Sequence, residues 1–189
     1  MKKSIKKSLI MTPMPVLIIG TYDENNVPNA MNAAWGMQCD TDVITISLSP
    51  HKTTENLKLK KSFTVAFATK ETVVESDYFG VESGTNINKI EKAGFHTIKS
   101  AYVDAPIIQE YPITLECEMI ELADDEGDYR LTGKVINITT EDSALDENGQ
   151  IDLDKINLIS YDSSKRVYRL IGNIVGKAFH DGLTIKNKQ

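Results

Sequence analysis

The apolar residues of this chain recur in short runs that turn residues separate, a pattern typical of β-strands. Valine, isoleucine, threonine and aromatic residues are frequent in these runs, as they are in strands. A turn over 23–26 separates the first two runs, which predicts a hairpin. The predicted strands lie at 16–21, 29–35, 43–48, 63–68, 113–122 and 129–140.

The last two predicted strands form a second hairpin around the acidic turn 124–128. Gly127 can adopt the positive φ that such a turn requires. Between Val135 and Ile136 the apolar positions change from one face of the strand to the other. We therefore predict a bulge or bend near Gly133, as small barrels require.

Predicted helices are few and short: one after Thr53, one over 72–79, and one over 86–92 that ends before Gly94. They do not alternate with strands, which argues against a doubly wound parallel sheet. The sequence instead predicts a mainly β protein with a closed or partly closed antiparallel barrel and peripheral helices. A chain of 189 residues is expected to form one domain, here 13–189 after a flexible basic segment at 1–12.

Charge and composition narrow the classes of partner. A net charge of -6 argues against a general nucleic-acid or membrane surface. The basic cluster at 2–7 is followed by an apolar stretch that two prolines interrupt, so it does not form a signal peptide. Apolar residues nowhere run long enough to span a membrane. We expect a cytoplasmic protein.

Cysteine and histidine do not indicate a metal or redox centre. Cys39 and Cys117 are too far apart in sequence for a redox pair or half of a zinc site. The three histidines, His51, His96 and His180, have no partner at helical spacing. We expect reduced thiols and no metal held by the protein.

The run from Ser49 to Thr54 joins a predicted strand to a predicted helix. A helix start presents free N–H groups and a positive dipole end, and here hydroxyls and Lys52 lie beside it, so the run is suited to bind phosphate. The alternative is that Thr53 or Thr54 only caps the helix and that Lys52 is a solvated surface charge.

Motifs for other phosphate and hydrolase chemistry are incomplete. The segment 172–178 resembles a P-loop, but its glycines are one residue too close and Ala178 occupies the magnesium-ligating position. The sequence has neither a Rossmann glycine motif nor a nucleophile elbow. This pattern favours a bound cofactor that supplies its own reactivity.

Four segments together resemble the flavin reductase-like family of FMN-binding split barrels, the group that includes flavoredoxin. The segments are 15–21 with 29–36, 49–57, 78–84 with 88–90, and 168–172 with 175–179. Asn32 stands where the family usually has threonine. The family binds the FMN phosphate with an arginine, and the residue that best matches it in this chain is His51 or Lys52. We favour Lys52 because an ammonium has three donors and a full charge.

The resemblance implies one FMN at each end of a homodimer interface. It implies that Gly84 allows close approach to the flavin and that Lys89 lies toward its N1–C2 edge, although Ser83 and Gly84 also fit a plain loop and Lys89 a solvated helix position. Trp35 fits a wall of the flavin site, a dimer contact, or simple burial, which we favour. The implied cofactor-binding residues are Asn29, Ala30, Met31, Asn32, Ala33, Trp35, Ser49, His51, Lys52, Thr53, Ser83, Gly84 and Lys89.

The implied activity is that of an FMN-dependent oxidoreductase that moves electrons through flavin N5, with NADH, NADPH or a redox protein as partner. No catalytic residue of the protein is identified. Two alternatives remain: a flavin-binding electron carrier without a nicotinamide site, and a split barrel whose ligand is not flavin.

Overall fold

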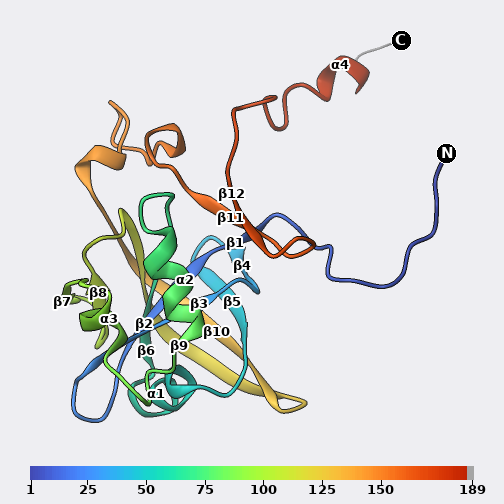
Figure 1. The fold of residues 1–189 in the computed structure, drawn as a ribbon. Coiled ribbons are helices and arrows are strands. Elements are labelled where there is room, and N and C mark those ends of the chain that lie inside the picture. The colour runs from blue at the N-terminus through green and yellow to red at the C-terminus, as the bar shows by residue number, and fades with distance from the viewer. Residues whose placement is uncertain (187–189) are drawn as a thin grey trace.

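The computed structural model describes residues 1–186, and most of them form antiparallel β-structure with helices at its edges (Figure 1). The largest sheet has seven strands, and every ladder in it is antiparallel. In spatial order its strands are β3 (Pro28–Ala33), β2 (Leu17–Tyr22), β6 (Ser62–Phe67), β9 (Ile113–Asp125), β10 (Asp128–Thr140), β5 (Val43–Leu48) and β4 (Gly36–Asp40).

This sheet curls around one apolar core but is not closed. The core contains buried side chains from six of its strands, including Leu17, Ile46, Phe63 and Leu131, so the strands must wrap around it. The two edge strands β3 and β4 follow each other in the chain, yet no ladder joins them within residues 1–186. The predicted antiparallel barrel is confirmed in its partly closed form, with the split between β3 and β4.

The long hairpin of β9 and β10 has the predicted turn and bulge. Glu126 and Gly127 both have positive φ at its tip, at 56° and 97°. The ladder shifts register between Thr132 and Gly133 and again between Val135 and Asn137. The extra residue is Ile120 of β9 at the first shift and Ile136 of β10 at the second, and the second explains the change of apolar face after Val135.

The helices lie outside the barrel. They are α1 (Lys52–Lys60), α2 (Val73–Val81), α3 (Lys89–Lys92) and α4 (Leu183–Lys186), with 3-10 turns at Asp142–Ala144 and Leu153–Lys155. A second apolar cluster lies between α2, α3 and the outer face of β2, with Phe79, Ile90 and Ile18 among its members. The helix expected at 86–92 begins only at Lys89, because the Asn88 side chain accepts the Glu91 N–H (3.3 Å) and caps it. Gly94 follows it with φ +74°, as predicted.

Two small sheets complete the body. β1 (Met14–Pro15), β11 (Ile159–Asp162) and β12 (Val167–Leu170) form one, and β7 (Thr97–Lys99) pairs with β8 (Pro106–Ile108) in the other. Residues 1–12 carry no helix or strand, and both they and residues 171–186 project from the body (Figure 1). In the part of the chain described, no helix is long and apolar enough to cross a membrane.

Gly133 tests how closely the strands pack at the first register shift. A Cβ at this position would lie 2.4 Å from Cζ of Phe63, whose side chain is fully buried and has nowhere to move. We predict that Gly133→Ala lowers the free energy of unfolding in urea by about 1–3 kcal/mol. Gly172→Ala is the control, since a Cβ there meets nothing within 4 Å. Equal stability of the two variants would contradict this account of the packing between Gly133 and Phe63.

Candidate functional site

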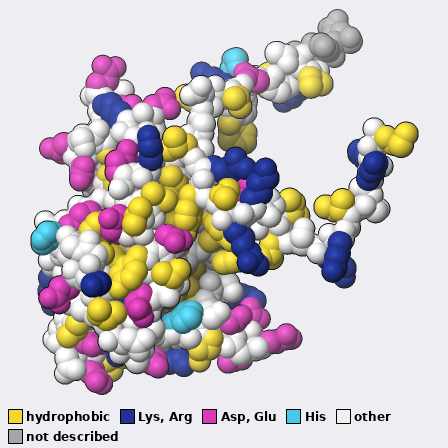
Figure 2. Space-filling view, viewed as in Figure 1, with side chains coloured by type: hydrophobic (Ala, Val, Ile, Leu, Met, Phe, Trp, Pro, Cys, Tyr) yellow, Lys and Arg dark blue, Asp and Glu magenta, His cyan; other side chains and the backbone are white. Residues whose placement is uncertain are grey.

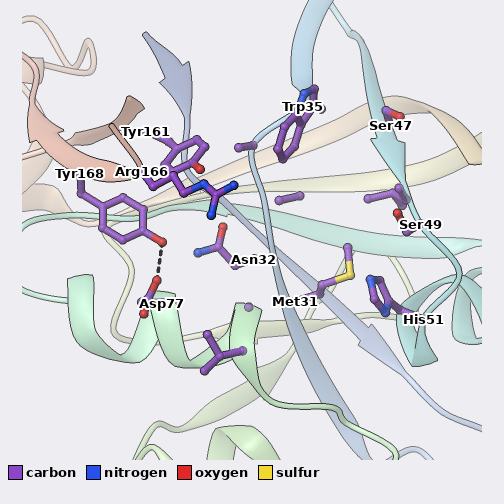
Figure 3. A pocket seen from close by; sticks show the side chains of 15 residues that line it. Met31, Asn32, Trp35, Ser47, Ser49, His51, Asp77, Tyr161, Arg166 and Tyr168 are labelled. Carbon is purple, nitrogen blue, oxygen red and sulfur yellow. Dashed lines mark hydrogen bonds between the residues drawn. The ribbon is translucent and has the colours of Figure 1, made fainter. Parts of the chain in front are cut away.

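Two adjoining cavities open beside the split in the barrel. The larger, about 390 Å³, lies between the β3–β4 link, the start of α1, the end of α2 and the β11–β12 hairpin (Figure 3). The smaller, about 60 Å³, lies between the start of α1 and the loop after α2. Four residues line both cavities, Met31, Asn32, His51 and Gly80, so the two form one continuous depression. Figure 2 shows hydrophobic side chains across the middle of the molecule and Lys and Arg side chains near the base of the projecting termini.

Aromatic rings wall the larger cavity. The ring of Trp35 lies 6.4 Å from that of Tyr161, which in turn lies 6.0 Å from Tyr168, measured between centroids. Trp35 is the only tryptophan of the chain and is 51% exposed, so the burial we favoured from the sequence is wrong. It is exposed because it occupies the two-residue link between β3 and β4, at the split, where no neighbouring strand covers it.

Hydrogen bonds fix the floor of the larger cavity to α2. The Tyr168 hydroxyl donates to the Asp77 carboxylate (2.7 Å), and Nδ2 of Asn32 donates to the Ser76 carbonyl (2.8 Å). Burial, followed by the hydrogen bond to Asp77, raises the pKa of Tyr168, so its phenol stays protonated at neutral pH. Asn32 therefore uses one side-chain amide N–H on the protein, and its side-chain oxygen accepts no hydrogen bond within residues 1–186.

The smaller cavity contains the start of α1. His51 is the N-cap, and its N–H donates to the hydroxyl of Thr54 (2.9 Å). Within residues 1–186 the backbone N–H groups of Lys52 and Thr53 have no acceptor, and the Lys52 ammonium has no ion-pair partner. The Thr53 hydroxyl accepts from Asn29 (2.9 Å), which leaves its own O–H free to donate. The site thus offers several donors and a positive charge, and none of them is paired with a carboxylate in the described residues, although Glu82 also lines the cavity.

The loop after α2 is held from beneath by Lys89. Its side chain is 4% exposed, and its ammonium donates to the carbonyls of Phe79 (2.8 Å) and Glu82 (2.9 Å). Burial lowers the pKa of Lys89 to about 8, against the opposing effect of Glu82. Lys89 is therefore not the solvated helix residue that the sequence also allowed. Two of its three N–H groups are bound to carbonyls, so only one remains for a ligand.

Gly84 permits a close approach, but to a side chain of the protein. A Cβ on Gly84 would lie only 2.0 Å from Oδ1 of Asn29. The glycine therefore lets residues 83–84 close over Asn29 at the edge of the smaller cavity.

The structure brings twelve of the thirteen predicted site residues to one of the two cavities. Ala33, Trp35 and Ser49 line only the larger, and Asn29, Lys52, Thr53, Ser83, Gly84 and Lys89 only the smaller. Ala30 lines neither, because its side chain is fully buried in the cluster under α2. Sequence reasoning missed several lining residues, including Asp77, Gly80, Tyr161, Arg166 and Tyr168.

Neither cysteine lines either cavity. Burial raises the pKa of the Cys117 thiol to about 12, and Cys39 is exposed on β4. Among residues 1–186, no group of three His, Cys, Asp or Glu side chains is arranged to hold a metal ion.

Comparison with known proteins gives one consistent result. The family model of the flavin reductase like domain matches residues 10–167. Flavoredoxin of Desulfovibrio vulgaris (Miyazaki F) is 29% identical, with a TM-score of 0.91 over 96% of this chain and 100% of that one. Flavoredoxin from Methanosarcina acetivorans is 25% identical, with a TM-score of 0.89 over 98% and 99%. A split-barrel protein from Shewanella frigidimarina NCIMB 400 shares the fold at 15% identity, with a TM-score of 0.79 over 88% and 86%.

Lys89 makes stability depend on pH in a defined direction. The pKa of Lys89 is about 8 in the folded protein, whereas its ordinary value, which we take for the unfolded chain, is 10.5. Between these pH values the unfolded chain therefore binds more protons than the folded one. Stability attributable to Lys89 must therefore rise with pH across this window. We predict that the difference in unfolding free energy, wild type minus Lys89→Met, increases by about 1–3 kcal/mol from pH 7.5 to 10.5.

Urea unfolding of both proteins at several pH values measures this difference. Groups such as Cys117 and the tyrosines titrate in both proteins, so their contributions cancel. A difference that stays constant, or that falls as the pH rises, would contradict the assignment of a buried ammonium at this position.

Proposed function

This chain belongs to the flavin reductase-like domain family, and from that premise we propose that it binds FMN and acts as an oxidoreductase. The proposal is supported by the two adjoining cavities, one polar and positively charged, the other walled by aromatic rings. A molecule with a charged phosphate tail and a flat ring system matches this division in both shape and chemistry.

The donor set of the smaller cavity fits the phosphate of FMN. Lys52 would supply charge, and the free N–H groups of Lys52 and Thr53 would point along the dipole of α1 toward the anion. The hydroxyls of Thr53 and Ser83 add further donors at the rim. Of the two candidates for the family arginine, Lys52 lines only the smaller cavity and carries a full charge, which supports it as the main cation.

The larger cavity fits the ring system. Met31 and Asn32 belong to both cavities and so lie where the tail of a mononucleotide would join its ring. Trp35 offers a half-exposed aromatic face for contact with a flat ligand. The hydrogen bond from Tyr168 to Asp77 keeps the opposite wall in place.

Bound FMN supplies redox chemistry, since its ring accepts and releases electrons through N5. The protein's part is to bind the phosphate, orient the ring and limit the access of water. No side chain of the larger cavity is placed as an obligatory acid or base. The half-buried phenol of Tyr168 donates its proton in a hydrogen bond to Asp77 and is not available as a base at neutral pH.

The test of this function uses the purified protein with added FMN. We expect a yellow complex whose flavin absorbance bleaches with NADH or NADPH in the absence of oxygen. A protein that fails to bind FMN would overturn the flavin assignment. A complex that no nicotinamide nucleotide bleaches, but that a reduced redox protein does, would assign the role of electron carrier instead.

We also propose that the protein acts as a homodimer. The projecting C-terminal segment carries apolar side chains, Ile174, Val175 and Phe179, that are 80–103% exposed. Exposed apolar groups in such number favour a partner surface. Light scattering coupled to size-exclusion chromatography should give twice the mass of one chain, and the mass of a single chain would contradict the proposal.

Lys52 provides the sharpest mutational test of the phosphate site. We predict that Lys52→Ala weakens FMN binding by about 1.5–3 kcal/mol, because one charge-assisted hydrogen bond is lost. Lys58→Ala is the matched control: Lys58 lies on the same helix, but its ammonium donates to the Tyr129 hydroxyl (2.7 Å) away from both cavities. Fluorescence titration of FMN measures both. An unchanged dissociation constant for Lys52→Ala would count against the assignment.

A further inference from the structure

One arginine of the larger cavity is not explained by flavin binding. Arg166 lies in the turn between β11 and β12, and its guanidinium projects between Tyr161, Tyr168 and Asn32 (Figure 3). Within the described residues it forms no ion pair and no side-chain hydrogen bond. The phosphate donors of Lys52 and Thr53 line only the other cavity, so Arg166 is a separate positive charge.

The other arginine of this hairpin shows the contrast. Nε of Arg169 donates to Oδ2 of Asp162 at 2.8 Å, so its charge is neutralised within the hairpin. The second oxygen of Asp162 builds the turn, because it accepts from the N–H and hydroxyl of Ser164 (3.1 and 2.6 Å) and from the N–H of Lys165 (3.2 Å). The carboxylate of Asp162 thus binds the turn and Arg169, and it forms no ion pair with Arg166.

The turn holds Arg166 in an unusual backbone conformation. Its φ is 55°, in the left-handed region that disfavours most residues with a side chain, and its N–H donates to the Asp162 carbonyl at 2.8 Å. Glycine or asparagine would adopt this conformation at lower cost. The fold therefore gives no reason for an arginine at this position, which leaves its side chain as the reason.

The surroundings define what the guanidinium can bind. Asp77 is the one carboxylate that lines the cavity among the described residues; it is bonded to Tyr168 and lies beyond ion-pairing distance of Arg166. Tyr161, Tyr168 and Trp35 supply flat apolar faces beside it. A planar fork of donors next to aromatic faces matches a planar ligand that carries an anionic group.

We propose that Arg166 determines specificity by binding the anionic group of the second substrate, a planar aromatic compound that bears a carboxylate or phosphate. Its role in a redox reaction rests on the proposed flavin function. Binding of the anion does not depend on flavin, because Arg166 and the aromatic side chains of the cavity make all the proposed contacts.

Trp35 lets this binding be measured without flavin. It is the only tryptophan and lines the same cavity, so its fluorescence reports ligand entry. Benzoate and its neutral isostere benzamide are the probes. We expect benzoate to bind the wild-type protein about tenfold or more tightly than benzamide, as a hydrogen-bonded charge pair would give. In Arg166→Asn this preference should vanish, and Arg166→Lys should keep only part of it.

The control variant is Lys165→Ala, which removes the neighbouring charge from the same turn but from outside the cavity. It should retain the preference for benzoate. Thermal unfolding should show Arg166→Asn at least as stable as the wild type, since asparagine tolerates the left-handed backbone. Equal benzoate binding by wild type and Arg166→Asn would overturn the proposal, and so would loss of the preference in Lys165→Ala.

Two further measurements separate the sources of the anion and the role of the cofactor. In the first measurement, nicotinamide mononucleotide replaces benzoate. If it binds more tightly than benzoate and this affinity depends on Arg166, the anion is a nucleotide phosphate. Inorganic phosphate that binds equally well would overturn the requirement for a ring. FMN affinity should change less than threefold in Arg166→Asn; a tenfold loss would place Arg166 in the cofactor site and overturn the proposal. Failure of the wild type to bind FMN, with benzoate binding intact, would refute only the flavin function.

Discussion

The unpaired edge between β3 and β4 is the constraint on which the rest of the structure depends. These two strands are joined by only two residues, yet the sheet that begins at one and ends at the other does not close between them. The link is tied instead to β5, where the Trp35 carbonyl accepts the Ser47 N–H at 2.8 Å. A closed ladder would bury Trp35 under a neighbouring strand. The open edge exposes it and leaves room for the larger cavity.

The two cavities combine because different parts of the fold converge at this edge. The helix that follows β5 begins beside the link, so its free N–H groups and Lys52 lie next to the residues of β3. The loop after α2 closes the other side and is held by Lys89. Burial of this lysine costs solvation free energy, which its hydrogen bonds to two carbonyls offset. The protein thus places the donors of the α1 start at one end of the depression and the aromatic rings at the other, an arrangement that suits a mononucleotide with a flat ring.

Much of this could be predicted from local sequence patterns. The alternation along 129–140 indicated the register shifts of the β9–β10 ladder, and the hydroxyl-rich junction at 49–54 indicated the start of α1. The missed residues share a different property. Tyr161, Arg166 and Tyr168 come from a hairpin more than 100 residues after β3, and only the tertiary fold brings them to Asn32 and Asp77. Trp35 was misjudged because burial follows from which strands pair, and a tryptophan at the end of an apolar run does not specify that the sheet is open beside it.

The central claim is that the start of α1 binds the phosphate of the cofactor. Comparison of FMN with riboflavin tests it most directly, because the two molecules share the ring system and differ only in that phosphate. Titration of the purified protein with each, at low and at high salt, should show FMN bound at least tenfold more tightly than riboflavin, with an advantage that shrinks as the salt concentration rises. Equal affinity for the two flavins, at every salt concentration, would contradict the account.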